Sequence, residues 1–459
     1  MSLLPPQPLS PLDGRYQSAV SPLGEHLSEA GLNRARIHVE VEWLIFQTDH
    51  GFFGQGELSP AEQAALRGIV THFDEQAIAW LAHKEAETKH DVKAIEYYVR
   101  EQLDQLGLAR LAELTHFAAT SEDINNLAYA TTVRDAITQV WLPRFDAVIE
   151  RIVELARRTR DAAMLSRTHG QPATPTTMGK EMAVFAHRLR RVRSQIAATE
   201  YLGKFSGATG TFAAHLAALP DEDWLGLSRA FVERLGLSWN PLTTQIESHD
   251  WQAELYARIT HANRILHNLA TDIWTYISLG YFRQIPEPGA TGSSTMPHKI
   301  NPIRFENAEA NLELSSAVLD SLAATLVTSR LQRDLTDSSS QRNIGVGLGH
   351  SLLALENLHR GLGDIDLDAA LLLDDLDHNW EVLGEAIQTV IRGEVAAGNS
   401  SIDDPYALLK TLTRGHRVGA AELAEFIRGL DISDAAKTRL LALTPASYNG
   451  LASALVDQL

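Results

Sequence analysis

Apolar residues recur along this chain with the spacing of an α-helix, and this periodicity restricts the fold more than any other feature. Within 145–152 they fall at i, i+3, i+4 and i+7, and similar stripes return in two later segments. The stripes are formed by Phe145, Val148, Ile149 and Ile152; Leu266, Leu269, Ile273 and Ile277; and Leu312, Leu319, Leu322 and Leu326. This spacing places apolar side chains on one helical face, whereas the alternating runs typical of strands are nearly absent. The sequence therefore predicts an all-α fold, with an unbroken helical segment from about Asn311 to Arg330.

Loop-forming residues interrupt the helical pattern at a few places and indicate how the chain is divided. Pro- and Gly-rich stretches occur in the first 22 residues, at 169–175 and 203–210, and most sharply at 286–297. Fixing such loops costs conformational entropy, so several of them in a helical chain indicate a functional role. A chain of 459 residues commonly forms roughly two to four domains. We expect an N-terminal helical domain over 1–112, a central long-helix bundle over 113–365 and a C-terminal helical domain over 366–459.

The composition excludes several classes of protein. The formal net charge is −18, whereas proteins that bind nucleic acid or anionic membranes are generally basic. Cysteine is absent, which excludes disulfides, thiolate nucleophiles and Cys-ligated metal centres. We find no pattern of a secretory signal at the N-terminus, and no window with the ~18 consecutive apolar residues of a membrane span. We therefore expect a cytoplasmic protein with no nucleic-acid or membrane partner.

Short motifs for cofactors and metals predict no such site. Gly345–Gly349 has the spacing GxGxG and follows no predicted strand, so it is a poor match to a dinucleotide-binding loop. P-loop, HExxH and GxSxG motifs are absent from the sequence. Among the 18 histidines, His261 and His267 are too far apart to share a helix face closely. We expect neither a cofactor nor a metal ion.

The segment Gly292–Pro302 is the most specific stretch of the chain. It reads Gly-Ser-Ser-Thr-Met-Pro-His-Lys-Ile-Asn-Pro and resembles the signature loop of the fumarase/aspartase superfamily, enzymes that eliminate fumarate from a succinyl group. Further segments are similar to the bacterial branch of the adenylosuccinate lyase family, namely Asp13–Tyr16, Lys89–Ala94, Thr120–Asn126, Arg167–Pro175 and Gln332–Ser338. The resemblance covers essentially the whole chain. It implies a fumarase/aspartase-like fold, in which two smaller helical domains flank a central bundle of long helices.

The resemblance also implies catalytic roles for particular residues. Eliminating fumarate requires a base for a weakly acidic C–H, stabilisation of an enolate-like carboxylate and a proton for the leaving nitrogen. Ser293 matches the family base, and Lys299 and the backbone N–H groups of the loop can stabilise its anion. His169 matches the general acid, since an imidazole titrates near neutrality. Glu306 matches the carboxylate that pairs with this histidine, and His90 matches a second histidine that positions the substrate.

The implied substrates carry two carboxylates and a phosphate, so their pocket must be locally cationic. Arginine is the natural bidentate partner of both groups. By family position, Arg15, Tyr16, Arg333, Ser338 and Arg342 correspond to nucleotide-phosphate contacts. Contacts on the succinyl side correspond to Thr120, Ser121, Gln245, Lys299 and Asn301. Lys89, His90, Asp91, Ser293 and Asn307 complete the predicted substrate-binding residues.

The resemblance implies two reactions of purine nucleotide biosynthesis: adenylosuccinate gives AMP and fumarate, and the succinylated carboxamide ribotide SAICAR gives AICAR and fumarate. It also implies a homotetramer whose active sites are each shared among three chains. Two alternatives remain open at this point. Argininosuccinate lyase and fumarase share the Gly-Ser-Ser loop but lack the His-Asp-Val and Thr-Ser-Glu-Asp context. A catalytically silent relative, as lens crystallins are, has no reason to keep Ser293, His169 and Glu306 together.

Overall fold

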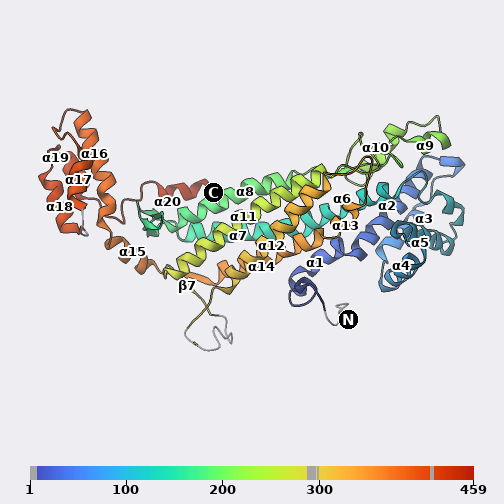
Figure 1. The fold of residues 1–459 in the computed structure, drawn as a ribbon, viewed down its shortest axis with the longest axis horizontal. Coiled ribbons are helices and arrows are strands. Elements are labelled where there is room, and N and C mark those ends of the chain that lie inside the picture. The colour runs from blue at the N-terminus through green and yellow to red at the C-terminus, as the bar shows by residue number, and fades with distance from the viewer. Residues whose placement is uncertain (1–7, 287–295, 297–298, 414–417) are drawn as a thin grey trace. The chain divides into compact units, whose positions relative to one another are not determined.

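The computed structural model describes residues 8–286, 296, 299–413 and 418–459, and it confirms the all-α prediction (Figure 1). The chain forms two compact units. Unit 1 comprises Met1–Phe145, Val192–Arg264 and Ala310–Glu356, and unit 2 comprises Asp146–Arg191, Ile265–Glu309 and Asn357–Leu459. The predicted domain boundaries near residues 112 and 365 are not tested by this division and stay a prediction.

Five long helices carry the predicted apolar stripes, and each contributes residues to both units. They are α7 (Leu142–Arg158), α8 (Met178–Ala197), α11 (Asp250–Ser278), α12 (Ile303–Leu326) and α14 (Ile344–Gly363). Figure 1 traces each of them as one continuous helix. The residues of the predicted stripes are buried, with the exception of the half-buried Ile277; Phe145, Leu266 and Leu319 are each 0% exposed. Burial of this kind stabilises long helices more than their intrinsic propensity does.

Unit 1 also holds the N-terminal helices. Its other helices are α1 (Gln17–Leu27), α2 (Glu29–Asp49), α3 (Pro60–Thr71), α4 (Glu75–Thr88), α5 (Asp91–Gln105), α6 (Ser121–Asp135), α9 (Ala213–Ala218), α10 (Trp224–Arg234) and α13 (Thr336–Gln341). A π-helical segment, Ala136–Trp141, links α6 to α7. Strands β5 (Leu202–Gly203) and β6 (Ser238–Trp239) pair in parallel. Helix α2 packs most extensively against α6, and also against α3 and α5.

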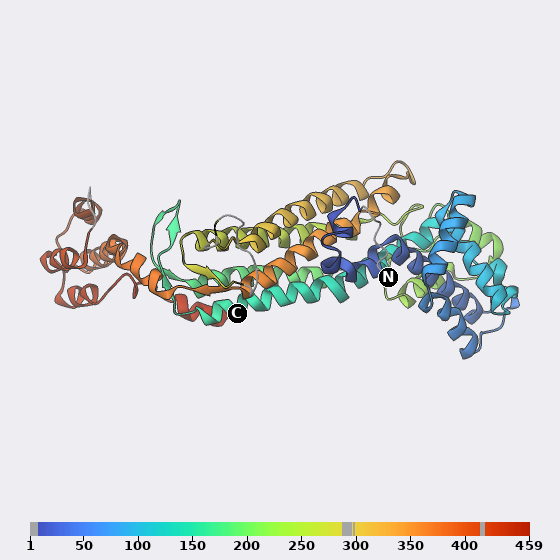
Figure 2. The same ribbon diagram turned by 90° about the horizontal axis from the view of Figure 1, so that it is seen from below.

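Unit 2 contains the C-terminal helices and most of the short strands. Its remaining helices are α15 (Ala369–Asp377), α16 (Gly384–Ala396), α17 (Pro405–Thr413), α18 (Ala420–Gly429), α19 (Asp434–Leu441) and α20 (Ala452–Leu455). Antiparallel pairs join β1 (Ala163–Met164) to β4 (Thr176–Thr177), β2 (Arg167–Thr168) to β3 (Gln171–Pro172), and β7 (Phe282–Gln284) to β8 (Ile365–Leu367). Figures 1 and 2 show α16 to α19 gathered together. Their buried side chains, among them Ile387, Ile391 and Ala436, form one apolar cluster.

Two helix boundaries differ from the sequence-based expectation. Helix α12 ends at Leu326 rather than near Arg330, because the backbone N–H of Arg330 donates to the Asp334 side chain and Leu331 has a left-handed φ of 53°. Near the N-terminus, Pro22 lies inside α1, although the first 22 residues were expected to form loops. The predicted break at 286–297 lies almost entirely outside the described residues. None of the helices in the described part of the chain is long and apolar enough to cross a membrane.

Candidate active site

Three of the predicted residues, Lys89, His90 and Asp91, lie at the start of α5. Lys89 ends α4 with a left-handed φ of 55°, and His90 follows it as the N-cap of α5. The His90 Nδ1 accepts a hydrogen bond from the Lys93 backbone N–H at 3.2 Å, so a neutral His90 ring carries its proton on Nε2. The His90 side chain is 52% exposed and is thus available to a substrate.

The start of α6 is fixed by a buried carboxylate. Asp123 accepts the backbone N–H of Thr120 at 2.8 Å, and it also accepts those of Ser206 and Gly207 at 2.8 and 3.0 Å. The Lys204 Nζ lies 2.9 Å from the same carboxylate, and neither side chain of this pair has any exposed surface. The carboxylate is thereby satisfied by hydrogen bonds, as a buried charge must be. This arrangement holds Thr120 and Ser121, two predicted succinyl-side residues, at the beginning of α6.

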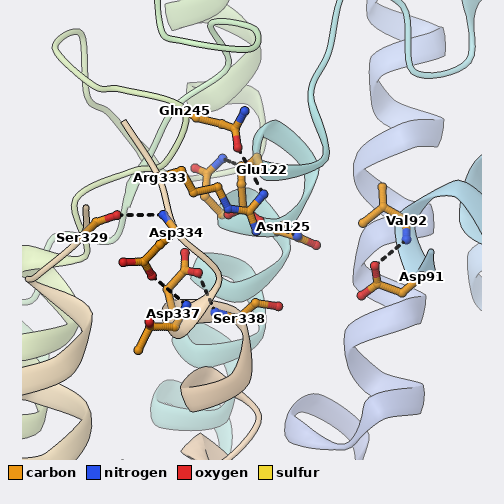
Figure 3. Close-up of polar contacts among 12 residues, drawn as sticks. Asp91, Val92, Glu122, Asn125, Gln245, Ser329, Arg333, Asp334, Asp337 and Ser338 are labelled. Carbon is orange, nitrogen blue, oxygen red and sulfur yellow. Dashed lines mark hydrogen bonds and ion pairs between the residues drawn. The ribbon is translucent and has the colours of Figure 1, made fainter. Parts of the chain in front are cut away.

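Arg333 lies between Gln245 and Glu122 (Figure 3). Its Nη1 donates to the Gln245 Oε1 at 3.2 Å, and its Nη2 lies 2.9 Å from the Glu122 Oε1. Asn125 donates to the same Glu122 oxygen at 2.7 Å. Burial raises the pKa of Glu122, and although Arg333 and Asn125 oppose this effect, the pKa stays above its ordinary value. The sequence-predicted Gln245 and Arg333 are therefore brought into direct contact.

A second ionic group surrounds Asp91. The Asp91 Oδ2 lies 2.8 Å from Arg36 Nη2 and 3.0 Å from Arg342 Nη2. Burial acts to raise the pKa of Asp91, but Arg36, the Val92 backbone N–H and Arg342 outweigh it and lower the pKa. Arg342 also donates to the Ser338 hydroxyl at 3.0 Å. Asp91, Ser338 and Arg342, all predicted from sequence, thus form one connected group.

The turn before α13 positions Arg333 and Ser338 (Figure 3). The backbone N–H of Asp334 donates to the Ser329 hydroxyl at 3.2 Å, and the Asp334 carboxylate accepts the Thr336 N–H at 2.8 Å. Asp337 accepts the Ser338 N–H at 2.6 Å. Short polar side chains that bond nearby backbone groups in this way stabilise turns.

Arg15 and Tyr16 lie just before α1. The Arg15 guanidinium carbon is 5.8 Å from the centre of the Tyr16 ring, a cation–π distance. A cavity of about 630 Å³ lies beside α1, and its walls include Gln17, Glu29 and Arg342. The predicted phosphate-binding Arg342 therefore lines a cavity large enough for a small ligand.

In unit 2, His169 occupies the tip of the β2–β3 hairpin. His169 and Gly170 form its two-residue loop, with φ values of 55° and 74°. Positive φ at both positions is the geometry of a type I′ turn, which favours glycine at the second position. Arg167 bonds Asp375 at 2.8 Å and Thr174 bonds Glu385 at 2.8 Å, which anchors both sides of the hairpin. The hairpin therefore presents an exposed His169 on a fixed support.

The other predicted residues of unit 2 lie at and before the start of α12. Glu306 accepts a hydrogen bond from Trp274 Nε1 at 3.1 Å, and Asn307 accepts one from Asn357 at 2.9 Å. Lys299 is exposed and Asn301 is half-buried. Ser293 lies outside the described residues. Within the described part of a single chain no bond joins His169 to Glu306, so their pairing stays a prediction.

Three residues of the site were missed by sequence reasoning: Arg36, Glu122 and Asn125. Glu122 and Asn125 lie within the Thr120–Asn126 motif, so the motif itself was a signal for them. Arg36 had a weaker signal, a single cation inside the largely apolar segment 35–46. In the described ranges, no cluster of three or more His, Asp or Glu side chains could hold a metal ion.

Comparison with known proteins shows two matches to family models and strong similarity to several curated enzymes. Residues 14–315 match a lyase family, and residues 329–449 match the adenylosuccinate lyase C-terminal family. The chain is 47% identical to the adenylosuccinate lyase of Escherichia coli strain K12 over 453 residues, which cover 98% of each chain. It is 46% identical to the adenylosuccinate lyase of Haemophilus influenzae, again with 98% of each chain covered.

Solved structures with a similar fold include more distant proteins. A 3-carboxy-cis,cis-muconate lactonizing enzyme from Pseudomonas putida superposes with a TM-score of 0.74 at 20% identity, covering 96% of this chain and 97% of that one. A fumarate lyase from Mesorhizobium gives a TM-score of 0.74 at 20% identity, covering 95% and 97%. At this level of identity the likeness establishes the fold and nothing finer.

Proposed function

The chain belongs to the adenylosuccinate lyase family and is a carbon–nitrogen lyase, and we propose that His169 and Ser293 carry out its proton transfers. The enzyme eliminates fumarate from adenylosuccinate, which leaves AMP, and from SAICAR, which leaves AICAR. In the structure, the observation that best supports these anionic substrates is the pair of arginines in unit 1: Glu122 holds Arg333, and Asp91 holds Arg342. Guanidinium groups fixed in this way suit a substrate with several anionic groups.

In the proposed reaction Ser293 removes a proton from the carbon adjacent to the one that bears the departing nitrogen, so that the C=C bond of fumarate forms as the C–N bond breaks. Negative charge then develops on the carboxylate of the same carbon, and Lys299 stabilises both this charge and the serine anion. His169 donates its proton to the leaving nitrogen as the C–N bond breaks. Its place at the tip of an anchored hairpin supports this role, since the ring is exposed and its support is fixed.

The binding residues divide into two sides. The residues that receive the phosphate are Arg15, Tyr16, Arg333, Ser338 and Arg342, and the place of Arg342 in the wall of the cavity beside α1 supports this assignment. The residues that receive the succinyl carboxylates are Thr120, Ser121, Gln245, Lys299 and Asn301. Arg333 is a predicted phosphate contact, and it bonds Gln245, a predicted succinyl-side contact. It therefore lies where the two sets of binding residues meet.

The functional protein is proposed to be a cytoplasmic homotetramer in which three chains build each site. Several apolar side chains on α11 and α12 support the assembly because they are exposed in the single chain. They include Trp274 (41% exposed) and Leu314 (51% exposed). Packing a second copy against these helices would remove them from water. Size-exclusion chromatography with light scattering tests the tetramer.

The reaction is tested by substrate choice. Purified protein is incubated separately with adenylosuccinate, SAICAR, argininosuccinate and malate, and fumarate formation or consumption is followed by absorbance. We expect turnover of adenylosuccinate and SAICAR only. Turnover of argininosuccinate or malate in their place would assign the chain to a sister enzyme and overturn the proposal.

The roles of Ser293 and His169 are tested by substitution. Ser293→Ala should lower kcat by about 10²–10⁴-fold, the usual contribution of a general base, while AMP still binds. His169→Ala should also act mainly on kcat. A Ser293→Ala enzyme that keeps more than about a tenth of the wild-type kcat would exclude Ser293 as the base. An increase in KM alone for His169→Ala would make His169 a binding residue.

A further inference from the structure

A continuous chain of polar contacts joins Gln245 to Ser338 through the interior of unit 1. At one end, Gln245 bonds Arg333, and Arg333 bonds Glu122 (Figure 3). At the other end, Ser338 bonds Arg342, and Arg342 bonds Asp91. The two ends lie on different segments of the chain, yet both contain residues predicted to bind the substrate.

Arg36 and Asn125 connect these two ends. The Asn125 amide donates to Glu122 at 2.7 Å through its nitrogen and accepts from Arg36 Nε at 2.9 Å through its oxygen. Arg36 then reaches Asp91 through Nη2 at 2.8 Å. Asn33 and Glu29 also lie next to Arg36, with Asn33 Oδ1 at 2.8 Å and Glu29 Oε1 at 3.9 Å.

The residues in the middle of this series of polar contacts are buried, whereas the arginines nearer its two ends are partly exposed. Arg36, Glu122 and Asn125 are 1%, 2% and 6% exposed, so they are almost entirely shielded from solvent. The side chains of Arg333 and Arg342 are 21% and 37% exposed and can contact a substrate. Buried charges are costly unless they are fully bonded, and Asn125 supplies a bond to each of the two charged groups beside it.

We propose that Arg36, Asn125 and Glu122 form a buried bridge that positions the Arg333–Gln245 pair and the Arg342–Ser338 pair for one substrate molecule. The proposal rests on the function proposed above. The three residues are positioning residues: they act through the two arginines and do not touch the substrate. Glu122 at one end of the bridge orients Arg333, and Arg36 at the other end bonds Asp91, which orients Arg342. The neutral amide of Asn125 between Glu122 and Arg36 sets the distance without adding charge.

The test replaces Asn125 by leucine, which has a similar shape and makes neither hydrogen bond. In the intact oligomer, we expect Asn125→Leu to weaken AMP binding, measured by calorimetry, and to raise KM for adenylosuccinate, each by about tenfold. The decisive comparison repeats the substitution in an Arg333→Gln background. The path from Asn125 through Arg36 and Asp91 to Arg342 remains intact in this background. Loss of Asn125 should therefore still weaken AMP binding, but by less than about threefold, because the part of its effect that passes through Arg333 is gone.

The matched control is Asn263→Ala. Asn263 is 0% exposed and bonds Ser315 at 3.0 Å, outside the bridge. Its substitution should have the same small effect on AMP affinity in both backgrounds. An equal loss of affinity on Asn125→Leu in both backgrounds would overturn the proposal, because Asn125 would then act through general stability alone.

Two further measurements keep the test decisive. If Asn125→Leu does not assemble, Asn125→Ser is compared in the same two backgrounds and must give the same non-additive result. AMP binding can be measured without turnover. A wild-type protein that binds AMP but does not convert adenylosuccinate would contradict the proposed reaction. The AMP affinities of the variants would still test the bridge. Wild type that binds no AMP would overturn both proposals.

Discussion

At the scale of single residues, His116, which lies four residues before Thr120, forms an ion pair with Glu40. The His116 Nδ1 lies 2.6 Å from one Glu40 oxygen, and the His116 backbone N–H donates to the other at 2.9 Å. Burial acts to lower the pKa of His116, but the fully buried Glu40 carboxylate outweighs it and raises the pKa above its ordinary value. The folded state therefore holds this proton more tightly than the unfolded chain does.

This pair should make stability depend on pH. Its contribution is fully present below the ordinary histidine pKa of about 6.5 and is lost as the pH rises through the raised, folded-state pKa. We expect His116→Gln to lower the midpoint of urea unfolding more at about pH 6 than at about pH 9. His83→Gln on the exposed face of α4 is the control and should have little effect at either pH. Equal losses for His116→Gln at both pH values would contradict the ion pair.

Sequence reasoning identified the residues that belong to motifs and missed those that only packing brings together. Asp91, Arg333 and Arg342 could be named from the resemblance, and the structure places them in one polar network. Arg36 could not be named, because its partners Asp91 and Asn125 are 55 and 89 residues away in sequence. Those contacts depend on α2 lying against both α5 and α6, which no local pattern specifies.

At the scale of elements, periodicity predicted the long helices and their buried faces but not the short strands. A two-residue strand such as β2 has no period to detect. The His169–Gly170 loop combines a left-handed histidine with a left-handed glycine, and only the glycine is a sequence signal for it. Leu331, which follows the end of α12, has a left-handed backbone conformation. Leucine rarely adopts this conformation, so its residue type gave no signal for it.

The junction between α7 and α8 depends on a glycine. A Cβ added at Gly179 would lie 2.4 Å from both the Ala156 carbonyl oxygen and the Arg160 Cα. Gly179→Ala should therefore destabilise the protein by about 1–3 kcal/mol, the usual cost of overpacking, and thermal unfolding measures it. The control is Gly393→Ala inside α16, where a Cβ meets nothing within 4 Å. That variant should be neutral or slightly stabilised, since alanine favours a helix. Equal melting temperatures for the two variants would refute the close approach.

At the scale of the whole molecule, the predicted catalytic residues are spread over both units. His90 belongs to unit 1, whereas His169 and Glu306 belong to unit 2. Ser293 lies outside the described residues. The proposed sharing of each site among three chains is consistent with a single chain that joins the binding residues of unit 1 and has no bond between His169 and Glu306 in its described part. The sequence alone could not derive such sharing, which came from the resemblance, because helical periodicity does not distinguish faces buried within a chain from faces buried between chains.

The central claim, that this lyase builds each site from His169 of one chain and Ser293 of another, is tested most directly by mixing two inactive proteins. Ser293→Ala and His169→Ala chains are combined in equal amounts, dissociated and reassembled, and adenylosuccinate turnover is measured. Random mixing gives both native groups to roughly one site in four. We predict that activity rises from near zero to about a quarter of the wild-type value. Hybrid tetramers that form, as native mass spectrometry would show, and yet remain inactive would contradict the account.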